Sequence, residues 1–282
     1  MFTLLTSLFT IPELRKRVIY TLLLMVVIRL GTHIPIAGVN LDKLGSLFSQ
    51  PGFLGFVDLF SGGALQNFSI FSLGILPYIN ASIIMQLLMV IIPKLKEIAE
   101  EGDAGRKQIA QYTRYLAIAI AVLQALMMSL GFSTQGIVNE GTNVIFFIIY
   151  SVVGMTAGAA LVMWLGEVIT EVGIGNGASL IIFVGIIARM PFYISNTYKV
   201  VLGGLNIINV IIMVTVLLAM IIGIVIMQEA QRKIPVQYAK RIVGRKMYGG
   251  QSTYIPMKLI QGGVLPIIFA SAILQFPLVL EG

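Results

Sequence analysis

Few side chains in this sequence could carry out chemistry, and their spacing fits none of the common catalytic patterns. The chain has one histidine, His33, and no cysteine. It can therefore form neither an HExxH zinc site nor a metal cluster built on paired histidines. It also contains no GxSxG motif, which would place a nucleophilic serine on a sharp turn. We expect no enzyme, no bound metal and no cofactor.

One run has the form of a cofactor motif. Residues 173–178 read GIGNGA, and G-x-G-x-x-G/A is the pattern of dinucleotide-binding loops. However, a long apolar run precedes it in place of a strand, and no acidic residue follows about 20 residues later to bind a ribose. We interpret the glycines as a tight turn between two helices.

The remaining candidate binding residues are cations that lie close together. Residues 232–258 hold seven Lys and Arg and no acid. This predicts a surface for an acidic or polyanionic partner, and composition leaves anionic lipid equally open. The prolines, glycines, β-branched and aromatic residues of the run favour an ordered, hairpin-like loop.

The elements that must position these residues are membrane helices. Apolar residues make up 57% of the chain and charged residues 11%, against roughly a quarter charged in soluble domains. Uncharged runs are long enough to cross a hydrocarbon core of about 30 Å as α-helices, which excludes a soluble enzyme. We predict seven spans, at residues 18–36, 71–92, 109–130, 144–166, 178–195, 207–228 and 254–280.

The cations are distributed unevenly around these spans. The amino terminus and the loops after spans two and six hold 15 of the 19 Lys and Arg residues. The other side holds only Lys43, Arg189 and Lys199, so we expect a cytoplasmic amino terminus. Arg29 lies inside the first span, where it should reach the interface or bond to a backbone carbonyl. No Asp or Glu lies inside a predicted span.

Residues 50–66, QPGFLGFVDLFSGGALQ, are apolar but too broken to span. Their proline and glycines leave a helical piece of about eight residues from Phe56, far short of a membrane crossing. The segment is either an external loop or a re-entrant segment enclosed by protein, the condition for irregular backbone at membrane depth. Spacing alone favours the external loop.

Five stretches become recognisable when they are taken together. They are FSGGALQNFSIFSLGILPYINASIIMQLL (60–88), EGDAGRKQIAQYTRY (101–115), MWLGEVITEVGIGNGASLIIF (163–183), QYAKRIVGRKMYGGQSTYIPMK (237–258) and GGVLPIIFASAIL (262–274). In this order the chain resembles the SecY family, the central subunits of bacterial-type Sec protein-conducting channels. The family has ten helices in two inverted halves of five around an hourglass pore.

The resemblance implies an all-α polytopic membrane protein with the SecY-like channel fold. Residues 1–200 would form the amino-terminal half, with helices one to five and a plug at about 50–66. Residues 201–282 would form part of the second half, with helices six and seven and a basic cytoplasmic loop at 229–258. Helices eight to ten have no counterpart, so we expect a chain truncated after the seventh helix.

The resemblance also implies roles for individual residues. The plug, a short helix that closes the outer funnel, matches Phe56, Val57, Asp58, Leu59, Phe60, Ser61, Gly62, Gly63, Ala64 and Leu65, which reverses the preference for an external loop. The apolar pore ring, which resists water and ions by dewetting, matches Ile75, Ile79, Ile182 and Ile268. Without the family, each of these isoleucines would be ordinary packing or lipid-facing surface.

Helices two and seven of the family form a lateral gate through which apolar segments partition into lipid. Its matching residues are Asn80, Gln86, Ala272 and Phe276. The basic loop resembles the family's docking loop for the ribosome and for the SecA motor ATPase. Its matching cations are Arg232, Lys233, Lys240, Arg241, Arg245 and Lys246.

The implied function is a pore-forming subunit for unfolded polypeptides in the bacterial plasma (inner) membrane. Its partners would be SecE-type and SecG-type small subunits, signal sequences, translocating chains and membrane lipids. The alternative is a secondary transporter, which also uses inverted repeats and broken helices. A ring of isoleucines would favour the channel, and a midplane pocket of converging carbonyl groups would favour the transporter.

Overall fold

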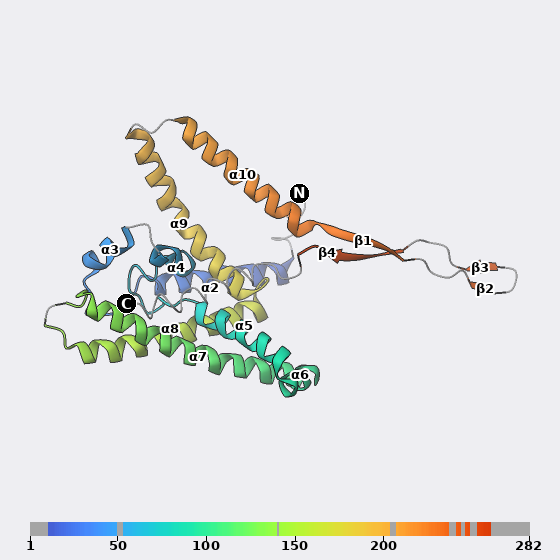
Figure 1. Ribbon diagram of the computed structural model, residues 1–282, viewed down its shortest axis with the longest axis horizontal. Coiled ribbons are helices and arrows are strands. Elements are labelled where there is room, and N and C mark those ends of the chain that lie inside the picture. The colour runs from blue at the N-terminus through green and yellow to red at the C-terminus, as the bar shows by residue number, and fades with distance from the viewer. Residues whose placement is uncertain are drawn as a thin grey trace. The chain divides into compact units, whose positions relative to one another are not determined.

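The computed structural model describes residues 11–49, 53–139, 141–203, 207–236, 241–243, 246–248 and 253–260. The described residues divide into two compact units, one up to residue 194 and one from residue 195 to 260. Figure 1 shows that the first unit is a set of helices and that the second carries strands as well as a helix.

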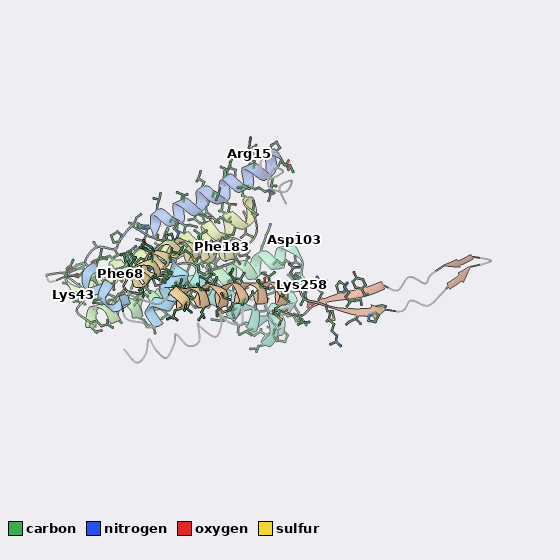
Figure 2. All side chains as sticks on the ribbon, turned by 90° about the horizontal axis from the view of Figure 1, so that it is seen from above. Arg15, Lys43, Phe68, Asp103, Phe183 and Lys258 are labelled. Atoms are coloured by element: carbon green, nitrogen blue, oxygen red, sulfur yellow. The ribbon has the colours of Figure 1, made fainter. Side chains whose placement is uncertain are left out.

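Eight helices of the first unit are described. Their bounds are α2 Pro12–Gly31, α3 Leu41–Ser49, α4 Phe53–Ser61, α5 Leu76–Ile91, α6 Pro93–Glu100, α7 Asp103–Thr134, α8 Val144–Val172 and α9 Gly177–Leu202, the last of which continues past the boundary. α8 packs against α7 and α2, and α5 packs against α7. Figure 2 shows Arg15 and Asp103 toward one end of this unit and Lys43 at the other.

Four described helices are long and apolar enough to cross a membrane, namely α7, α8, α9 and α10 (Ile207–Glu229). They match predicted spans three to six. α5 and α6 together would supply a fifth crossing, although they meet at an angle of 105°. α2 covers most of the predicted first span, but Arg15, Lys16, Arg17 and Arg29 fall within its 20 residues.

The predicted second span began at residue 71, whereas α5 begins at Leu76. Residues 62–75 form buried turns instead, because Gly62, Gly63 and Gly74 take positive φ angles of 65°, 95° and 54°, which glycine adopts without steric cost. The exposed polar groups of such a backbone need partners. They find some of them in residues 34–36, where Ile70 N donates to Ile34 O at 3.1 Å.

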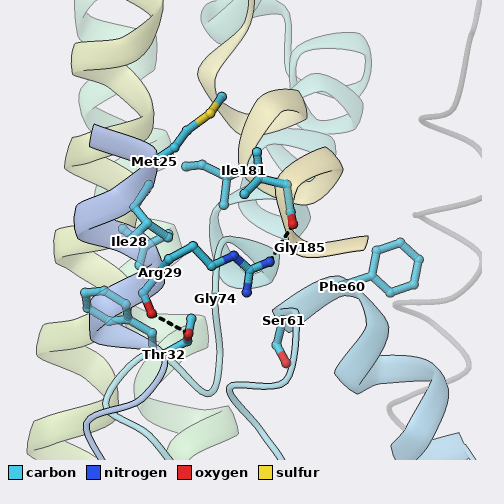
Figure 3. A pocket seen from close by; sticks show the side chains of 12 residues that line it. Met25, Ile28, Arg29, Thr32, Phe60, Ser61, Gly74, Ile181 and Gly185 are labelled. Atoms are coloured by element: carbon cyan, nitrogen blue, oxygen red, sulfur yellow. Dashed lines mark hydrogen bonds between the residues drawn. The ribbon is translucent and has the colours of Figure 1, made fainter. Parts of the chain in front are cut away.

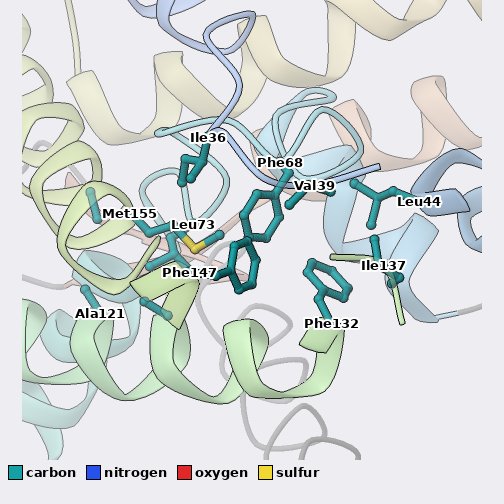
Figure 4. Packing of buried hydrophobic residues seen from close by; sticks show 12 residues of the cluster. Ile36, Val39, Leu44, Phe68, Leu73, Ala121, Phe132, Ile137, Phe147 and Met155 are labelled. Carbon is teal, nitrogen blue, oxygen red and sulfur yellow. The ribbon is translucent and has the colours of Figure 1, made fainter. Parts of the chain in front are cut away.

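An apolar core of the first unit surrounds Phe68, which is fully buried (Figure 4). Its ring stacks on Phe147 of α8 at 5.7 Å between centroids and meets Phe132 of α7 edge-on at 5.4 Å. Phe68 itself has a φ of 43°, a region that bulky residues rarely occupy. The core therefore fixes the turns of residues 62–75 against α7 and α8.

The predicted turn at residues 173–178 is confirmed. α8 ends at Val172 and α9 begins at Gly177, with a φ of 72° at Gly175 between them. The turn is tied to α2, because Ile174 N donates to Thr21 Oγ1 at 3.1 Å.

The second unit contains α10 and two antiparallel strand pairs. β1 (Gln231–Val236) pairs with β4 (Thr253–Lys258), and β2 (Arg241–Val243) pairs with β3 (Lys246–Tyr248). The predicted hairpin-like loop is therefore confirmed. The predicted start of span seven at residue 254 is wrong, because that residue belongs to β4, and residues 261–282 lie outside the described residues.

Candidate functional site

The candidate site begins with α4, a helix of nine residues that is far too short to cross a membrane. Asp58 and Ser61 at its carboxyl end are buried, and so are Ala64 and Leu65 in the turns that follow. This burial favours an enclosed segment over an external loop. Of the expected plug, residues 50–52 lie outside the described residues, as do the side chains of Phe56 and Val57.

Asp58 makes an ion pair with Arg189 of α9, in which Arg189 Nη2 donates to Asp58 Oδ2. The other carboxylate oxygen, Oδ1, accepts from Leu65 N and Gln66 N, each at 3.1 Å, and from Ser61 Oγ at 2.9 Å. Only 3% of the Asp58 side chain and 16% of the Arg189 side chain are exposed. A carboxylate thus lies inside the helical unit although the predicted spans contain none.

Arg29 of α2 also reaches this segment (Figure 3). Its Nη1 donates to Gly62 O at 2.9 Å, and its Nη2 donates to Val184 O on α9 at 2.5 Å. The prediction that Arg29 bonds to a backbone carbonyl is confirmed. Carbonyl oxygens are suitable partners here, because a guanidinium offers five donors in a fixed planar arrangement.

The two glycines after α4 make room for the two arginines. A Cβ atom on Gly62 would lie 2.7 Å from both Nη1 and Nη2 of Arg29, and one on Gly63 would lie 3.0 Å from Arg189 Nη2. α9 is equally close, since a Cβ on Gly185 would lie 3.1 Å from Phe60 O. These contacts hold α4 and the following turn against α2 and α9.

A cavity of about 20 Å³ lies beside Arg29, large enough for one water molecule. Its lining is mostly apolar and comes from α2, α4, α8, α9 and the turns before α5; the residues are Met25, Ile28, Arg29, Thr32, Phe60, Ser61, Phe71, Gly74, Val162, Ile181, Val184 and Gly185. Of the expected pore-ring residues that the structure describes, Ile75, Ile79 and Ile182 do not line it.

The structure describes three of the four expected ring residues. Ile75 and Ile79 are buried at the start of α5, and Ile79 N donates to Ile75 O at 3.1 Å, which places both on one helix face. The side chains of Ile75 and of Ile181 on α9 both lie against Gly166 of α8, where a Cβ would be 3.1 Å from Ile75 Cδ1 and 3.2 Å from Ile181 Cδ1. Ile182 is half-buried, and Ile268 lies outside the described residues.

The expected gate is described on one side only. Asn80 of α5 is half-buried, and its Oδ1 is buried with no hydrogen-bond partner among the described residues. Gln86, further along the same helix, is exposed. Ala272 and Phe276 lie outside the described residues.

The expected docking cations lie on the strand pairs of the second unit. Arg232 and Lys233 are exposed on β1, and Lys233 Nζ lies 4.7 Å from the ring centroid of Tyr254 on β4. Arg241 lies on β2 and Lys246 on β3, in strands whose side chains are not described. Lys240 and Arg245 lie outside the described residues.

Sequence reasoning missed the contact of Asp58 with Arg189, because Arg189 was expected only as a cation of the outer side. One signal could have found it. Asp58 is the single acid in a glycine-rich apolar segment, and Arg29 and Arg189 stand alone in apolar runs, where a charge needs a partner. Within the described part of the chain, no three His, Cys, Asp or Glu side chains are grouped to hold a metal ion.

The fold, with its long apolar helices and this enclosed segment, defines a multi-pass helical membrane protein. Solved channel structures share the fold. One described as a protein-conducting channel covers 92% of this chain and 56% of its own, with a TM-score of 0.63 at 19% identity. Another, described as Sec61 in the canine ribosome-channel complex from the endoplasmic reticulum, gives a TM-score of 0.62 over 92% of this chain and 56% of its own, at 18% identity.

Sequence comparison identifies the family. The SecY family profile matches residues 69–282. The protein translocase subunit SecY of Thermotoga maritima is 49% identical over 95% of this chain and 64% of its own length, and that of Thermus thermophilus is 44% identical over 96% and 63%. The chain belongs to the SecY family and spans about two thirds of the length of these relatives.

Proposed function

We propose that this chain is a pore-forming channel subunit, and not an enzyme, through which unfolded polypeptides cross a membrane and apolar segments leave sideways into lipid. The observation that carries the proposal is the burial of Asp58 and Ser61 in α4, a helix too short to span, which contacts α2 and α9 beside an apolar cavity in a member of the SecY family. One solved SecY structure is described as having a plug domain that stabilises the closed state of the channel. This chain shares the fold of that structure with a TM-score of 0.64 at 19% identity, and the match covers 94% of this chain and 57% of the SecY chain.

In this proposal residues 56–65 are the plug. Two features of this segment support the assignment. Asp58 and Ser61 are buried in the protein, and Gly62 and Gly63 turn the chain back toward α5. Such a segment closes a pathway while it is seated and opens it when it is displaced. We refer to residues 56–65 as the plug segment from here on.

Ile75, Ile79, Ile182 and Ile268 form the proposed pore ring. The burial of Ile75 and Ile79 supports a constriction at the start of α5. An apolar ring excludes water and ions by dewetting, yet it contacts a passing chain without specific bonds. A channel with such a ring accepts sequences of many kinds.

The proposed lateral gate lies between α5, with Asn80 and Gln86, and the segment that carries Ala272 and Phe276. The buried Oδ1 of Asn80, which has no hydrogen-bond partner among the described residues, supports this role, since a polar atom without a partner lowers the cost of separating two helices. A hydrophobic segment in the pathway would then partition into lipid, the solvent that it prefers.

The strand pairs of the second unit are the proposed docking surface for the ribosome and for a SecA-type motor, with Arg232, Lys233, Lys240, Arg241, Arg245 and Lys246. Exposed cations on ordered strands support a polyanionic or acidic partner. SecE-type and SecG-type subunits complete the proposed assembly. The location is the bacterial plasma membrane, with the amino terminus and the strand pairs on the cytoplasmic side.

Translocation in a defined system tests the proposal. The intact complex, reconstituted into lipid vesicles with a SecA-type ATPase and a preprotein bearing a signal sequence, should protect the preprotein from added protease in an ATP-dependent manner. Vesicles without the complex provide the background. Preprotein that stays accessible to protease, with a correctly inserted and folded complex, would contradict the proposed function.

A further inference from the structure

We propose that Arg189 and Arg29 are positioning residues that hold the plug segment in its closed place, and that the Asp58–Arg189 ion pair is the contact that must break before the plug segment moves. This inference rests on the proposed channel function. Its parts are the carboxylate of Asp58, the two guanidinium groups, and Gly62 and Gly63, against which the guanidinium groups lie.

The two oxygens of Asp58 have different partners, and this gives the residue two roles. Oδ1 accepts from Leu65 N, Gln66 N and Ser61 Oγ, all within the same short stretch of chain. These bonds fold the turn after α4. Oδ2 accepts from Arg189, 131 residues away in the sequence. The same carboxylate therefore shapes the plug segment and fastens it to α9.

Arg29 binds backbone carbonyl oxygens, whereas Arg189 binds a carboxylate. Its guanidinium donates to Gly62 O in the plug segment and to Val184 O in α9, so it connects α2, the plug segment and α9. Arg189 lies five residues after Val184 and contacts the plug segment from that same helix. Two adjacent sites on α9 thus fasten the plug segment, one through a carbonyl and one through a carboxylate.

The energetic asymmetry of these contacts decides which one controls the movement. A buried ion pair that loses one partner leaves an uncompensated charge in a low-dielectric site, which costs far more than a lost bond to a neutral carbonyl. Displacement of the plug segment separates Asp58 from Arg189 and leaves both to be hydrated or paired anew. The ion pair therefore sets most of the resistance to opening, and water or polypeptide entering the pathway lowers it.

Ion leakage measures this resistance directly. The intact complex is reconstituted into vesicles of bacterial polar lipid that hold an iodide-quenched dye, and iodide influx is recorded without any translocating chain. Arg189→Gln and Asp58→Asn should each raise the influx rate roughly tenfold, because each removes the same coupled contact. The double variant should leak no faster than the leakier single variant, and Arg189→Lys should stay within about threefold of the wild-type rate, since it keeps the charge.

Lys199→Gln is the matched control, because it removes a cation from the exposed end of the same helix, and it should leak like the wild type. Wild-type leakage by folded Arg189→Gln, or additive effects in the double variant, would overturn the inference. Should Arg189→Gln fail to fold, Asp58→Asn alone decides, because it keeps the shape and one acceptor oxygen. Preprotein import by the wild type, measured in the same vesicles, separates failure of this inference from failure of the proposed function. If the wild type imports preprotein but the variants do not leak, only this inference is rejected. If the wild type imports no preprotein, the proposed channel function itself is rejected.

Discussion

Asp58 of α4 and Arg189 of α9 form a buried ion pair that joins the most irregular part of the chain to one of its membrane helices. Each residue stands in an apolar stretch, where an isolated charge would be costly. Together they are compatible with burial, and the three further donors to Asp58 Oδ1 complete its hydrogen bonding. The ion pair and these hydrogen bonds therefore hold residues 58–66 in one defined conformation.

Removing a charge from this pair should destabilise the protein more than removing one from the ion pair between Arg114 of α7 and Glu167 of α8. In the second pair, 43% of the Arg114 side chain and 21% of the Glu167 side chain are exposed. We expect Glu167→Gln to cost about 1 kcal/mol or less and Asp58→Asn about 3 kcal/mol or more. Thermal unfolding of both variants in the same detergent checks this, and equal losses of melting temperature would contradict it.

Gly62→Ala should destabilise the closed protein, because its φ of 65° strains any side chain and its Cβ would lie 2.7 Å from the Arg29 guanidinium. We expect a cost of about 1–3 kcal/mol and a measurable rise in ion leakage. Gly55→Ala in α4 is the matched control, since no atom of the described residues lies within 4 Å of its added methyl group. Equal behaviour of the two variants would refute the packing of Arg29 on Gly62.

Phe68→Ala should be among the most destabilising single changes in the first unit. The ring is fully buried between Phe132 and Phe147, and truncating a buried Phe costs about 3–5 kcal/mol. Phe146→Ala serves as the comparison, because that side chain is 65% exposed and should lose little stability. The recovered yield and melting temperature of the two variants measure the difference.

Neutralising Arg232 and Lys233 together should weaken binding to ribosomes roughly tenfold at low salt and less at high salt, because exposed charges act through a screened field. Co-sedimentation with purified ribosomes at two salt concentrations provides the measurement. Lys43→Ala, which removes an exposed cation from the predicted outer side, should bind like the wild type. Loss of binding that does not depend on salt would point to damaged strand pairing instead.

The regular helices were largely predictable from the sequence. Long apolar runs with few charges specify α7, α8, α9 and α10, because an apolar stretch of such length has few other stable structures. The turn at residues 173–178 and the strand pairing after α10 also follow from local glycine, proline and β-branched residues. These features depend on interactions between residues that are close in the sequence.

The irregular stretch at residues 62–75 was not predictable in the same way. Its apolar composition suggested an earlier start of a span, whereas Phe68 takes a positive φ and the chain bonds back to residues 34–36. The pairing of Asp58 with Arg189 depends on two elements that are 131 residues apart. Tertiary contacts of this kind override local patterns, and only the lone charges in apolar runs hint at them.

Cross-linking to a polypeptide in transit tests the channel most directly, and the chain has no native cysteine to interfere. Ile79→Cys in the intact, reconstituted complex should form a disulfide with a cysteine in a preprotein arrested during translocation. Lys43→Cys, on an exposed side chain outside the proposed ring, should not. Efficient cross-linking at Ile79 alone is the predicted result. A clean negative at Ile79 with a chain demonstrably arrested in the membrane would contradict the assignment of a polypeptide pathway past α5.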